Sequence, residues 1–381
     1  MATTKKKVVK NYSVNDDEYY QLLAEGKFKG TKGDYYTKKI FEKILYDEHS
    51  SMDINPRPKY HDKYLNAEYN KENRTVKLED GSIITLAENQ KARQFKSTVI
   101  VYTPAHTISV NNPGLIQYDL SKGESPMITL RPIAVNASIA EILWIYQKES
   151  TDLVVFDELL GKRTWDDSKP ASENKVNNWW IDWALKDENG NYLLNEAGHP
   201  YIGSTYGEIV KKYKLVETKL RELKENPDSR YHIISLWQYE MFEKAHGLKP
   251  CAFQTFWNIR HGKDGKDYLD MKLVQRSSDF ATAGCINQIQ YTTLLILFAR
   301  HLGVEPGVFT WDPTNIQIYD RHVEQVKEML KREPIDCNPR IVVNSESTNF
   351  YDVLPGDIKL VDIPREEIKE KNPQLFFPLG I

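Results

Sequence analysis

Hydrophobic and polar residues are distributed unevenly along the chain, and the pattern changes near residue 95. Residues 1–92 are rich in Lys, Asp, Glu, Asn and Tyr, with a short helical period at 35–46 and a hairpin pattern at 75–86 that turns on Asp80-Gly81. We interpret residues 1–92 as an amino-terminal extension of unknown role. The main domain is expected to span residues 93–381.

From residue 97 onward, the apolar segments are longer and closer together. Their pattern predicts strands at 98–102, 231–237, 251–260 and 268–277, and helices at 137–147, 209–225 and 289–302. Residues 162–200 mix several tryptophans with Asp, Asn, Ser and Gly, which is typical of long loops with short helical pieces, and long loops are often functional. Because strands and helices do not alternate regularly, we expect an α+β fold rather than a doubly wound sheet.

Composition narrows the classes of partner and compartment. The chain has 381 residues and a net charge of -3, so it can bury a large core but has no global basic field for a nucleic-acid polymer. Three widely spaced cysteines suggest a reducing compartment, and the start of the chain lacks the apolar core of a signal peptide. The longest apolar run, 294–299, is far too short to cross a bilayer. We therefore expect a cytoplasmic protein without a membrane partner.

The predicted strand pair places one cysteine beside polar residues. Asp264-Gly265 favours a hairpin between strands 251–260 and 268–277, and antiparallel pairing then brings Cys251 near Gln275, Arg276 and Ser277. An arginine beside a cysteine stabilises the thiolate and can also hold a phosphate. The alternatives are that Cys251 only fills space in the core and that Arg276 forms an ordinary ion pair.

The apolar helix after this hairpin begins with polar residues. Its composition predicts a central, buried position, which would hold Asn287 near the strand ends. The side chain of Asn287 could cap the helix, or it could read the edge of a base, since an amide both donates and accepts hydrogen bonds.

These residues lie in motifs that resemble a known family. Pro250-Cys251, the run Gln275-Arg276-Ser277-Ser278-Asp279, Asn287 and Ile318-Tyr319 resemble the nucleotide-site motifs of thymidylate synthases and of the related phage pyrimidine hydroxymethylases. The segment leading to Glu141 resembles the family's glutamate helix, and Trp180 and Trp183 resemble its folate-side tryptophans. The resemblance runs from about Arg93 to the end of the chain. It implies a mixed β-sheet layered with helices, with one sheet face forming a dimer interface.

The resemblance implies a covalent reaction at the base of deoxyuridylate (dUMP). Cys251 would add to C6 of the ring, which makes C5 nucleophilic towards the methylene group of 5,10-methylenetetrahydrofolate. Arg276 and Ser277 would hold the phosphate, with Arg230 arriving from the other subunit of a homodimer and Arg93 as a candidate mobile phosphate arginine.

Further roles also follow from the resemblance alone. Glu141 and Tyr206 join Cys251 as catalytic residues, with Glu141 organising the waters that move protons. The remaining substrate-binding residues are Gln275, Asn287, Gln317 and Tyr319. The residues that the resemblance assigns to folate binding are Asp279, Trp180, Gly284 and Ile381.

Several positions depart from the family pattern and bear on the product. Ala252 and Gln317 stand where histidines are usual, and Tyr231 stands where a second phosphate arginine is usual. Hydride transfer to the shared intermediate gives thymidylate, whereas attack by water gives the 5-hydroxymethyl nucleotide. The extension, the loop insertions and the substitutions favour a deoxyuridylate hydroxymethylase, which would act in the host cytoplasm if the chain is of phage origin. The alternatives are a thymidylate synthase, favoured by Trp180 and the carboxyl-terminal tail, and a non-catalytic nucleotide-binding protein.

Overall fold

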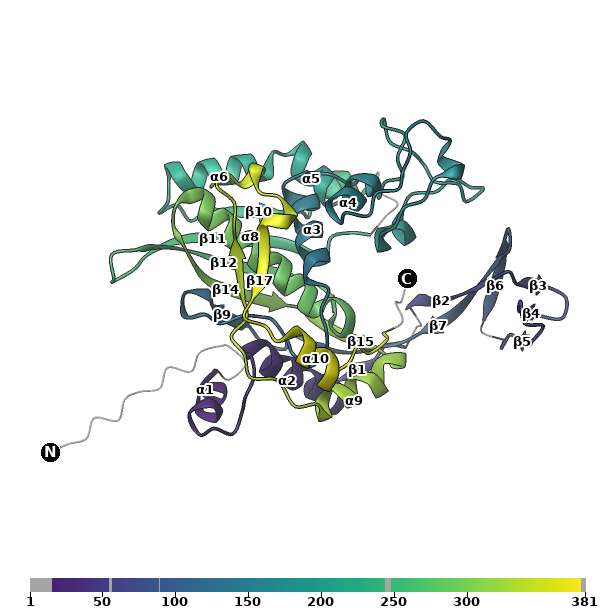
Figure 1. Cartoon of the computed structure of the whole chain (residues 1–381), viewed down its shortest axis with the longest axis horizontal. Helices are drawn as coiled ribbons and strands as arrows, with labels where there is room; N and C mark the ends of the chain where they lie inside the picture. Colours follow the sequence, from purple (N-terminus) through teal and green to yellow (C-terminus); the bar gives the residue numbers. More distant parts are fainter. Residues whose placement is uncertain (1–15, 55–56, 89, 244–247, 378–381) are drawn as a thin grey trace.

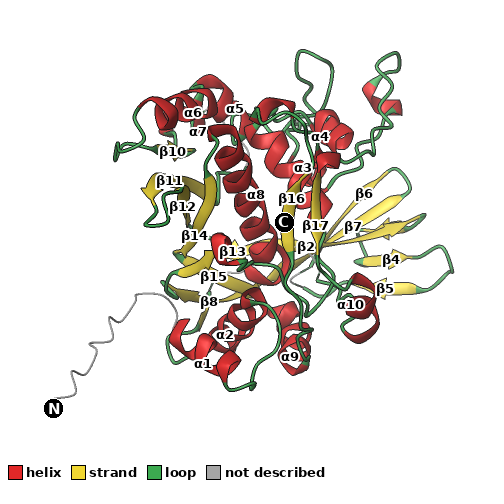
Figure 2. Ribbon diagram, turned by 60° about the vertical axis from the view of Figure 1, so that its left-hand side comes forward, coloured by secondary structure: helices red, strands yellow, loops and turns green. Residues whose placement is uncertain are grey.

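A central helix and a mixed sheet form the core of the computed structural model, which describes residues 16–54, 57–88, 90–243 and 248–377. The sheet has the order β10-β11-β12-β14-β9, and α8 (Cys285–Leu302) lies between it and α3 (Val135–Tyr146), as Figure 2 shows. Helix α8 is apolar on nearly all sides, as expected for a helix that the sheet covers on one side and α3 covers on the other. The strands are β10 (Ile233–Ser235), β11 (Ala252–His261), β12 (Asp267–Gln275), β14 (Glu305–Pro313) and β9 (Ile116–Asp119).

The predicted hairpin is present and sets the register of the sheet. β11 pairs antiparallel with β12, with Ala252 opposite Gln275, and β12 pairs parallel with β14. Along β12, Leu269, Met271 and Leu273 are buried while the residues between them are partly exposed. This alternation means that one face of the sheet packs on the core and the other faces outward.

A second sheet lies below the first and has the order β1-β8-β15-β13. Its strands are β1 (Ser51–Met52), β8 (Thr107–Asn111), β15 (Asn315–Tyr319) and β13 (Ser278–Asp279). Because β13 follows β12 directly, the carboxyl end of the main hairpin runs into this sheet. A two-stranded sheet pairs β16 (Arg340–Val343) with β17 (Ile358–Val361), and Figure 2 draws it to the right of α8.

Part of the amino-terminal extension is built into the main core. The predicted helix at 35–46 is α2 (Lys32–Tyr46), which begins with a capping box between Thr31 and Asp34 and buries Tyr36 and Phe41. The buried Asp34 carboxylate also accepts hydrogen bonds from the Thr129 amide (2.6 Å) and hydroxyl (2.8 Å). The extension and the main domain therefore share buried contacts, and the division at residue 93 stays a prediction.

Residues 57–105, which include the later part of the extension, form an arm that projects from one side of the molecule (Figure 1). The arm contains two three-stranded sheets and a small apolar cluster of its own around Val76 and Val99. The predicted hairpin at 75–86 is the β4–β5 pair of the outer sheet. The strands are β2 (Arg57–Leu65), β7 (Thr98–Ala105), β6 (Lys91–Phe95), β3 (Glu68–Asn70), β4 (Thr75–Lys77) and β5 (Ile83–Thr85).

Two predicted elements differ from the structure. The single helix expected at 209–225 is α5 (Gly207–Lys212) followed by α6 (Leu215–Glu225), because Lys214 takes a left-handed conformation with φ 48°. The strand expected at 231–237 is only the three residues of β10, and Tyr231 is 85% exposed. The other helices are α1 (Asp16–Ala24), α4 (Leu153–Leu159), α7 (Tyr239–Phe242), α9 (Val323–Lys331) and α10 (Arg365–Lys371).

The α+β class is confirmed, since mixed sheets and helices share one core. The sheet face as a dimer interface stays a prediction. In the part of the chain that the structure describes, none of the helices combines the length and the apolar character that crossing a membrane requires.

Candidate active site

The carboxyl end of the hairpin, the start of α8 and a loop between α4 and α5 enclose one large cavity of about 1020 Å³. We call Cys251, Gln275, Arg276, Ser277 and Asn287 the strand wall, and Trp179, Trp180 and Trp183 the tryptophan wall. The cavity brings together most of the residues predicted from the sequence: Glu141, Trp180, Tyr206, Cys251, Gln275, Arg276, Ser277, Asp279, Asn287, Gln317 and Tyr319.

Main-chain pairing holds Cys251 at the end of the strand wall. The Arg276 amide donates to the Cys251 carbonyl (2.9 Å), and the Cys251 amide donates to the Tyr206 hydroxyl (3.1 Å). The Arg276 guanidinium lies 3.5 Å from Cys251 Sγ. Burial raises the pKa of the Cys251 thiol, while the Arg276 charge and the Tyr206 hydroxyl act in the opposite direction. The thiol is therefore paired with the groups that stabilise a thiolate.

Arg276 is held in place by carbonyl groups rather than by a carboxylate. Its Nε donates to the Pro250 carbonyl (2.9 Å) and its Nη2 to the Lys249 carbonyl (2.7 Å), and the guanidinium lies 5.7 Å from the centre of the Trp237 ring. These partners are neutral, and within the described part of the chain no carboxylate forms an ion pair with Arg276, so its positive charge is available to an anion. Ser277 is next to it, and its hydroxyl accepts from the Gln317 amide (3.2 Å).

Tyr206 occupies a strained position at the start of α5. Its φ is 39°, which a bulky residue rarely adopts, and such strain is often found at active sites. The next residue must be glycine, because a Cβ on Gly207 would lie 2.2 Å from the Ser150 carbonyl oxygen. This close approach fixes the turn that directs the Tyr206 hydroxyl to the Cys251 amide.

Glu141 is a buried carboxyl group on α3 that lines the cavity. Burial raises the pKa of Glu141 to about 7, and the donors of Gln290 and Trp180 act against that rise. A carboxyl group with this pKa can both give and take a proton near neutral pH, as a general acid and base must.

The amide of Asn287 is oriented by two neighbours. Its oxygen accepts from Gln275 Nε2 (2.9 Å), and its nitrogen donates to Gln290 Oε1 (3.0 Å). Asn287 lies inside the first turn of α8, whose N-cap is Gly284, so its side chain does not cap that helix. One donor hydrogen and one acceptor lone pair are left to face the cavity.

Trp180 and Asp279 mark the other side of the cavity. The Trp180 ring packs edge-on against Tyr206 at 5.6 Å between centroids and at a tilt of 51° against Trp144 at 5.8 Å. Asp279 accepts a hydrogen bond from the Thr282 hydroxyl through Oδ2, while its buried Oδ1 has no hydrogen-bond partner among the described residues. Tyr319 also lines this part of the cavity.

Four predicted site residues do not line the cavity in the described chain. Arg230 is exposed just before β10, and Arg93 lies on β6 with its guanidinium near Gly190. Gly284 is next to the lining residue Ala283, and a Cβ there would lie 2.3 Å from the Phe280 ring. Ile381 lies outside the described residues.

The structure adds lining residues that sequence reasoning missed. Gln290 and Tyr291 follow Asn287 by three and four positions, so helical spacing could have identified them. Asp53 had no such signal, because it comes from the extension and is held at the cavity by tertiary contacts, among them hydrogen bonds that its carboxylate accepts from the Thr107 amide and hydroxyl (both 2.9 Å). Other polar lining residues that were not predicted are Thr107, Ser109, Ser138, Ser278, Thr282 and Asn315.

An arginine-paired thiol, a buried carboxyl group and an aromatic wall in one cavity define a class of transferase that modifies a planar anionic substrate. A thymidylate synthase family model matches residues 82–371, and the chain belongs to the thymidylate synthase family. Enzymes of this family transfer a one-carbon unit to C5 of dUMP, with methylenetetrahydrofolate as the donor.

Individual relatives agree with this assignment. The thymidylate synthase of Streptococcus agalactiae serotype Ia is 42% identical over 267 residues, which cover 70% of this chain and 84% of the relative. That of Streptococcus mutans is 41% identical over 266 residues, with the same coverage. The solved structure of thermostable thymidylate synthase A from Bacillus subtilis superposes with a TM-score of 0.64 at 25% identity, covering 92% of this chain and 99% of that one.

Proposed function

We propose that this protein is a thymidylate synthase, which converts dUMP to thymidylate while methylenetetrahydrofolate becomes dihydrofolate. The observation that carries the proposal is the arrangement of Cys251, Arg276 and Tyr206 in the same cavity as Glu141 and Trp180. The relatives named thymidylate synthase support this product over the hydroxymethyl nucleotide that the extension and the substitutions favoured. The integration of α2 into the main core further weakens the extension as an argument for altered chemistry.

The cavity fits a flat folate ring. The tryptophan wall offers aromatic surface. The buried Asp279 Oδ1, which lies 3.9 Å from His322 Nδ1 and accepts no hydrogen bond among the described residues, can accept from the N–H groups of such a ring. When bound, methylenetetrahydrofolate supplies the one-carbon unit and the hydride. Trp180 and Asp279 would hold the ring and exclude water, and water exclusion is what favours the methyl product over the hydroxymethyl product.

The strand wall would bind and activate the nucleotide. Arg276 and Ser277 would hold the phosphate, which also sets the base above Cys251 Sγ. The Cys251 thiolate would form a bond to C6 of the uracil ring, and the electron pair displaced from the C5–C6 double bond would make C5 nucleophilic. Asn287, fixed by Gln275 and Gln290, would pair its free donor and acceptor with the base edge. Tyr319 and Gln317 would contact the sugar.

Glu141 and Tyr206 would manage protons after the new C5–carbon bond forms. The proton on C5 must leave before the double bond can reform and Cys251 can depart. Glu141, with its pKa raised to about 7 by burial, would accept that proton through water, and the Tyr206 hydroxyl next to Cys251 would help to transfer it.

We further propose a homodimer that shares its sites. The outward face of the main sheet carries Ile233, Phe256 and Lys272 in one row, and Ile233 is 38% exposed. Arg230, exposed just before this face, would then reach the phosphate site of the partner, where it would offset the loss of the arginine that Tyr231 replaces.

Mixing inactive subunits tests the shared site. Equal amounts of Cys251→Ser and Arg230→Ala subunits should regain about a quarter of wild-type turnover, because half of randomly paired dimers are mixed and each holds one intact site. A mixture that shows mixed dimers by native mass spectrometry but no rescue would refute the contribution of Arg230 across the interface.

Product analysis tests the proposed reaction. Incubation with dUMP and methylenetetrahydrofolate, followed by mass spectrometry of both products, should give thymidylate and dihydrofolate in equal amounts. Formation of 5-hydroxymethyl-dUMP with tetrahydrofolate would establish the hydroxymethylase instead. Nucleotide binding without either product would indicate a binding protein.

A further inference from the structure

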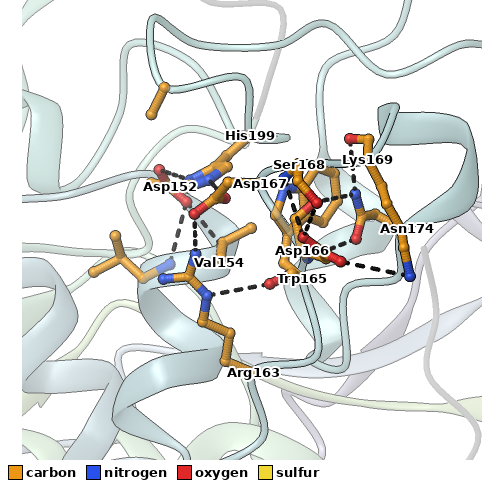
Figure 3. A network of polar contacts seen from close by, with 12 residues as sticks. Asp152, Val154, Arg163, Trp165, Asp166, Asp167, Ser168, Lys169, Asn174 and His199 are labelled. Carbon is orange, nitrogen blue, oxygen red and sulfur yellow. Dashed lines mark hydrogen bonds and ion pairs between the residues drawn. The ribbon is translucent and has the colours of Figure 1, made fainter.

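A histidine joins two distant loop segments next to the tryptophan wall. His199 Nδ1 lies 2.7 Å from Asp152 Oδ2, and its Nε2 lies 3.0 Å from Asp167 Oδ1 (Figure 3). The ring is buried and packs edge-on against Trp165 at 5.6 Å. Asp152 is 47 positions away in sequence and Asp167 is 32 positions away. We call His199, Asp152 and Asp167 the clasp.

Both carboxylates of the clasp have structural partners. Asp152 caps α4 by accepting from the amides of Val154 (2.8 Å) and Val155 (3.2 Å), and its Oδ2 also accepts from the Asn195 amide group (2.9 Å). On the other side, Asp167 accepts from Arg163 Nη2 at 2.7 Å, and Arg163 also pairs with Glu158 of α4. The clasp therefore ties the loop after α4 to the first turn of α4 itself.

Helix α4 is the support of the tryptophan wall. Its Asp157 carboxylate accepts from the Asn177 amide (2.7 Å) and from Asn178 Nδ2 (2.8 Å), and Asn178 Oδ1 accepts from the Trp180 amide (3.2 Å). Phe156 of α4 packs edge-on against Trp179 at 5.1 Å. The position of the Trp179–Trp183 turn therefore depends on the position of α4.

A second route leads from the clasp to Trp180 through α3. The Asp152 carbonyl accepts from Trp144 Nε1 at 2.9 Å, and the Trp144 ring contacts Trp180. Trp144 lies on α3 three positions after Glu141. Displacement of Asp152 would thus disturb Trp180 from both sides, without His199 itself lining the cavity.

We propose that His199 is a positioning residue for folate binding, acting through Asp152 and α4 to hold the tryptophan wall. The inference rests on the proposed function and adds a device that sets folate affinity. Because the nucleotide contacts belong to the strand wall, loss of the clasp should weaken folate binding more than nucleotide binding or the chemical step.

The charge of His199 gives this device a pH dependence. Burial disfavours the charged ring, but the hydrogen bonds that the ring donates to Asp167 and Asp152, together with the charges of these carboxylates, outweigh burial, so the pKa of His199 is raised above its usual 6.5. The groups that face the ring are these two carboxylates, with Arg163 paired to Asp167 from outside. A raised folded-state pKa means that the clasp is fully formed below pH 6.5 and loosens as the pH rises through the higher folded-state value. The neutral ring can donate to only one of the two carboxylates.

Binding of tetrahydrofolate in the presence of dUMP tests the inference. Tetrahydrofolate lacks the one-carbon unit, so its Kd does not depend on which product the enzyme releases, and this inference and the proposed function can fail separately. His199→Ala should raise that Kd about 10- to 100-fold, while the Kd of dUMP changes less than about 3-fold. Asp167→Asn, which leaves the α4 cap intact, should raise the tetrahydrofolate Kd in the same direction by a smaller factor.

The chain offers a matched control. His261 also lies between two carboxylates, Asp267 at 2.7 Å and Asp228 at 2.9 Å, but its side chain is 57% exposed and it lies at the far end of β11. His261→Ala should leave both dissociation constants unchanged.

Two further readouts separate positioning from loss of folding. Hydrogen exchange of the backbone amides at 177–183 should be faster in His199→Ala than in the wild type. The Kd of the wild type for tetrahydrofolate should rise between about pH 6 and pH 9, as His199 loses its proton. The contribution of His199 to this rise should be absent in His199→Ala. Equal folate affinity and equal exchange in the wild type and both clasp variants would overturn the proposal, as would equal losses of nucleotide and folate affinity.

Discussion

The strand wall of the cavity is carried by a strand pair and a helix, whereas the tryptophan wall is carried by a loop. Main-chain hydrogen bonds of the β11–β12 pair fix Cys251 opposite Arg276, so their placement depends little on any one side chain. The Trp179–Trp183 turn is held instead by the side chains of Asp157 and Asn178 and by the clasp. We therefore expect substitutions in the strand wall to affect turnover or base selection, and substitutions around the loop to affect mainly the binding of the folate.

The largest effect is expected at the nucleophile. Cys251→Ser should lower turnover by about 10⁴-fold or more, because a hydroxyl near neutral pH is a far weaker nucleophile than a thiolate. The melting temperature should change little, since the pairing around residue 251 is made by main-chain atoms. As a control, Cys285→Ala removes a buried thiol that contacts the Pro126 carbonyl and should keep measurable turnover. Abolition of chemistry by Cys285→Ala in a folded protein would shift the nucleophile assignment.

A smaller loss of turnover is expected for the buried carboxyl group. Glu141→Gln should lower kcat by about 10²–10⁴-fold, with similar dUMP affinity, because proton transfer is lost. Since burial raises the pKa of Glu141 from 4.5 to about 7, the wild-type fold loses stability as the pH rises across that interval. The glutamine variant should lack this part of the pH dependence in thermal melts. Identical pH profiles of kcat and stability in both proteins would contradict the role of Glu141.

The residues of the strand wall could be predicted from the sequence, whereas the contacts that hold the tryptophan wall could not, because the two walls are held by different kinds of interaction. The turn at Asp264-Gly265 and the alternation of strand residues were enough to place Cys251 beside Arg276, because antiparallel register is a local consequence of the turn. His199 and Asp152 meet from loops without periodicity, so no sequence pattern connected them. The break at Lys214 also lacked a signal, because the amphipathic pattern continues through it.

The next largest effect is expected on the choice of base, at Asn287 of the strand wall. Gln275 and Gln290 fix the Asn287 amide, so Asn287→Asp should lower the preference for dUMP over deoxycytidylate by about 10-fold or more. A carboxyl group can accept from the cytosine amino group and, when protonated, donate to N3. The measurement is kcat/KM for both nucleotides in both proteins. An unchanged ratio would remove Asn287 from base reading.

The smallest effect is expected in the loop. Asn178→Ala removes hydrogen bonds to the Leu153 carbonyl (2.9 Å) and to Asp157 and frees the Trp180 amide. Loss of these hydrogen bonds should cost about 1 kcal/mol of folate binding, which corresponds to a KM for methylenetetrahydrofolate that is about 5-fold higher, with kcat nearly unchanged. Steady-state kinetics with each substrate varied in turn would show it. A fall in kcat without a change in KM would erase the distinction between the two walls.

The most direct test of the two-wall account traps the nucleotide on the protein. A 5-fluoro analogue of dUMP cannot release the C5 substituent as a proton, so the covalent complex should persist and be visible by intact mass. We predict an adduct containing both the nucleotide and the methylene folate, mapped to the peptide of Cys251, in the wild type and absent in Cys251→Ser. An adduct on Cys285 or Cys337, or bound nucleotide without any adduct when both ligands are present, would contradict the account.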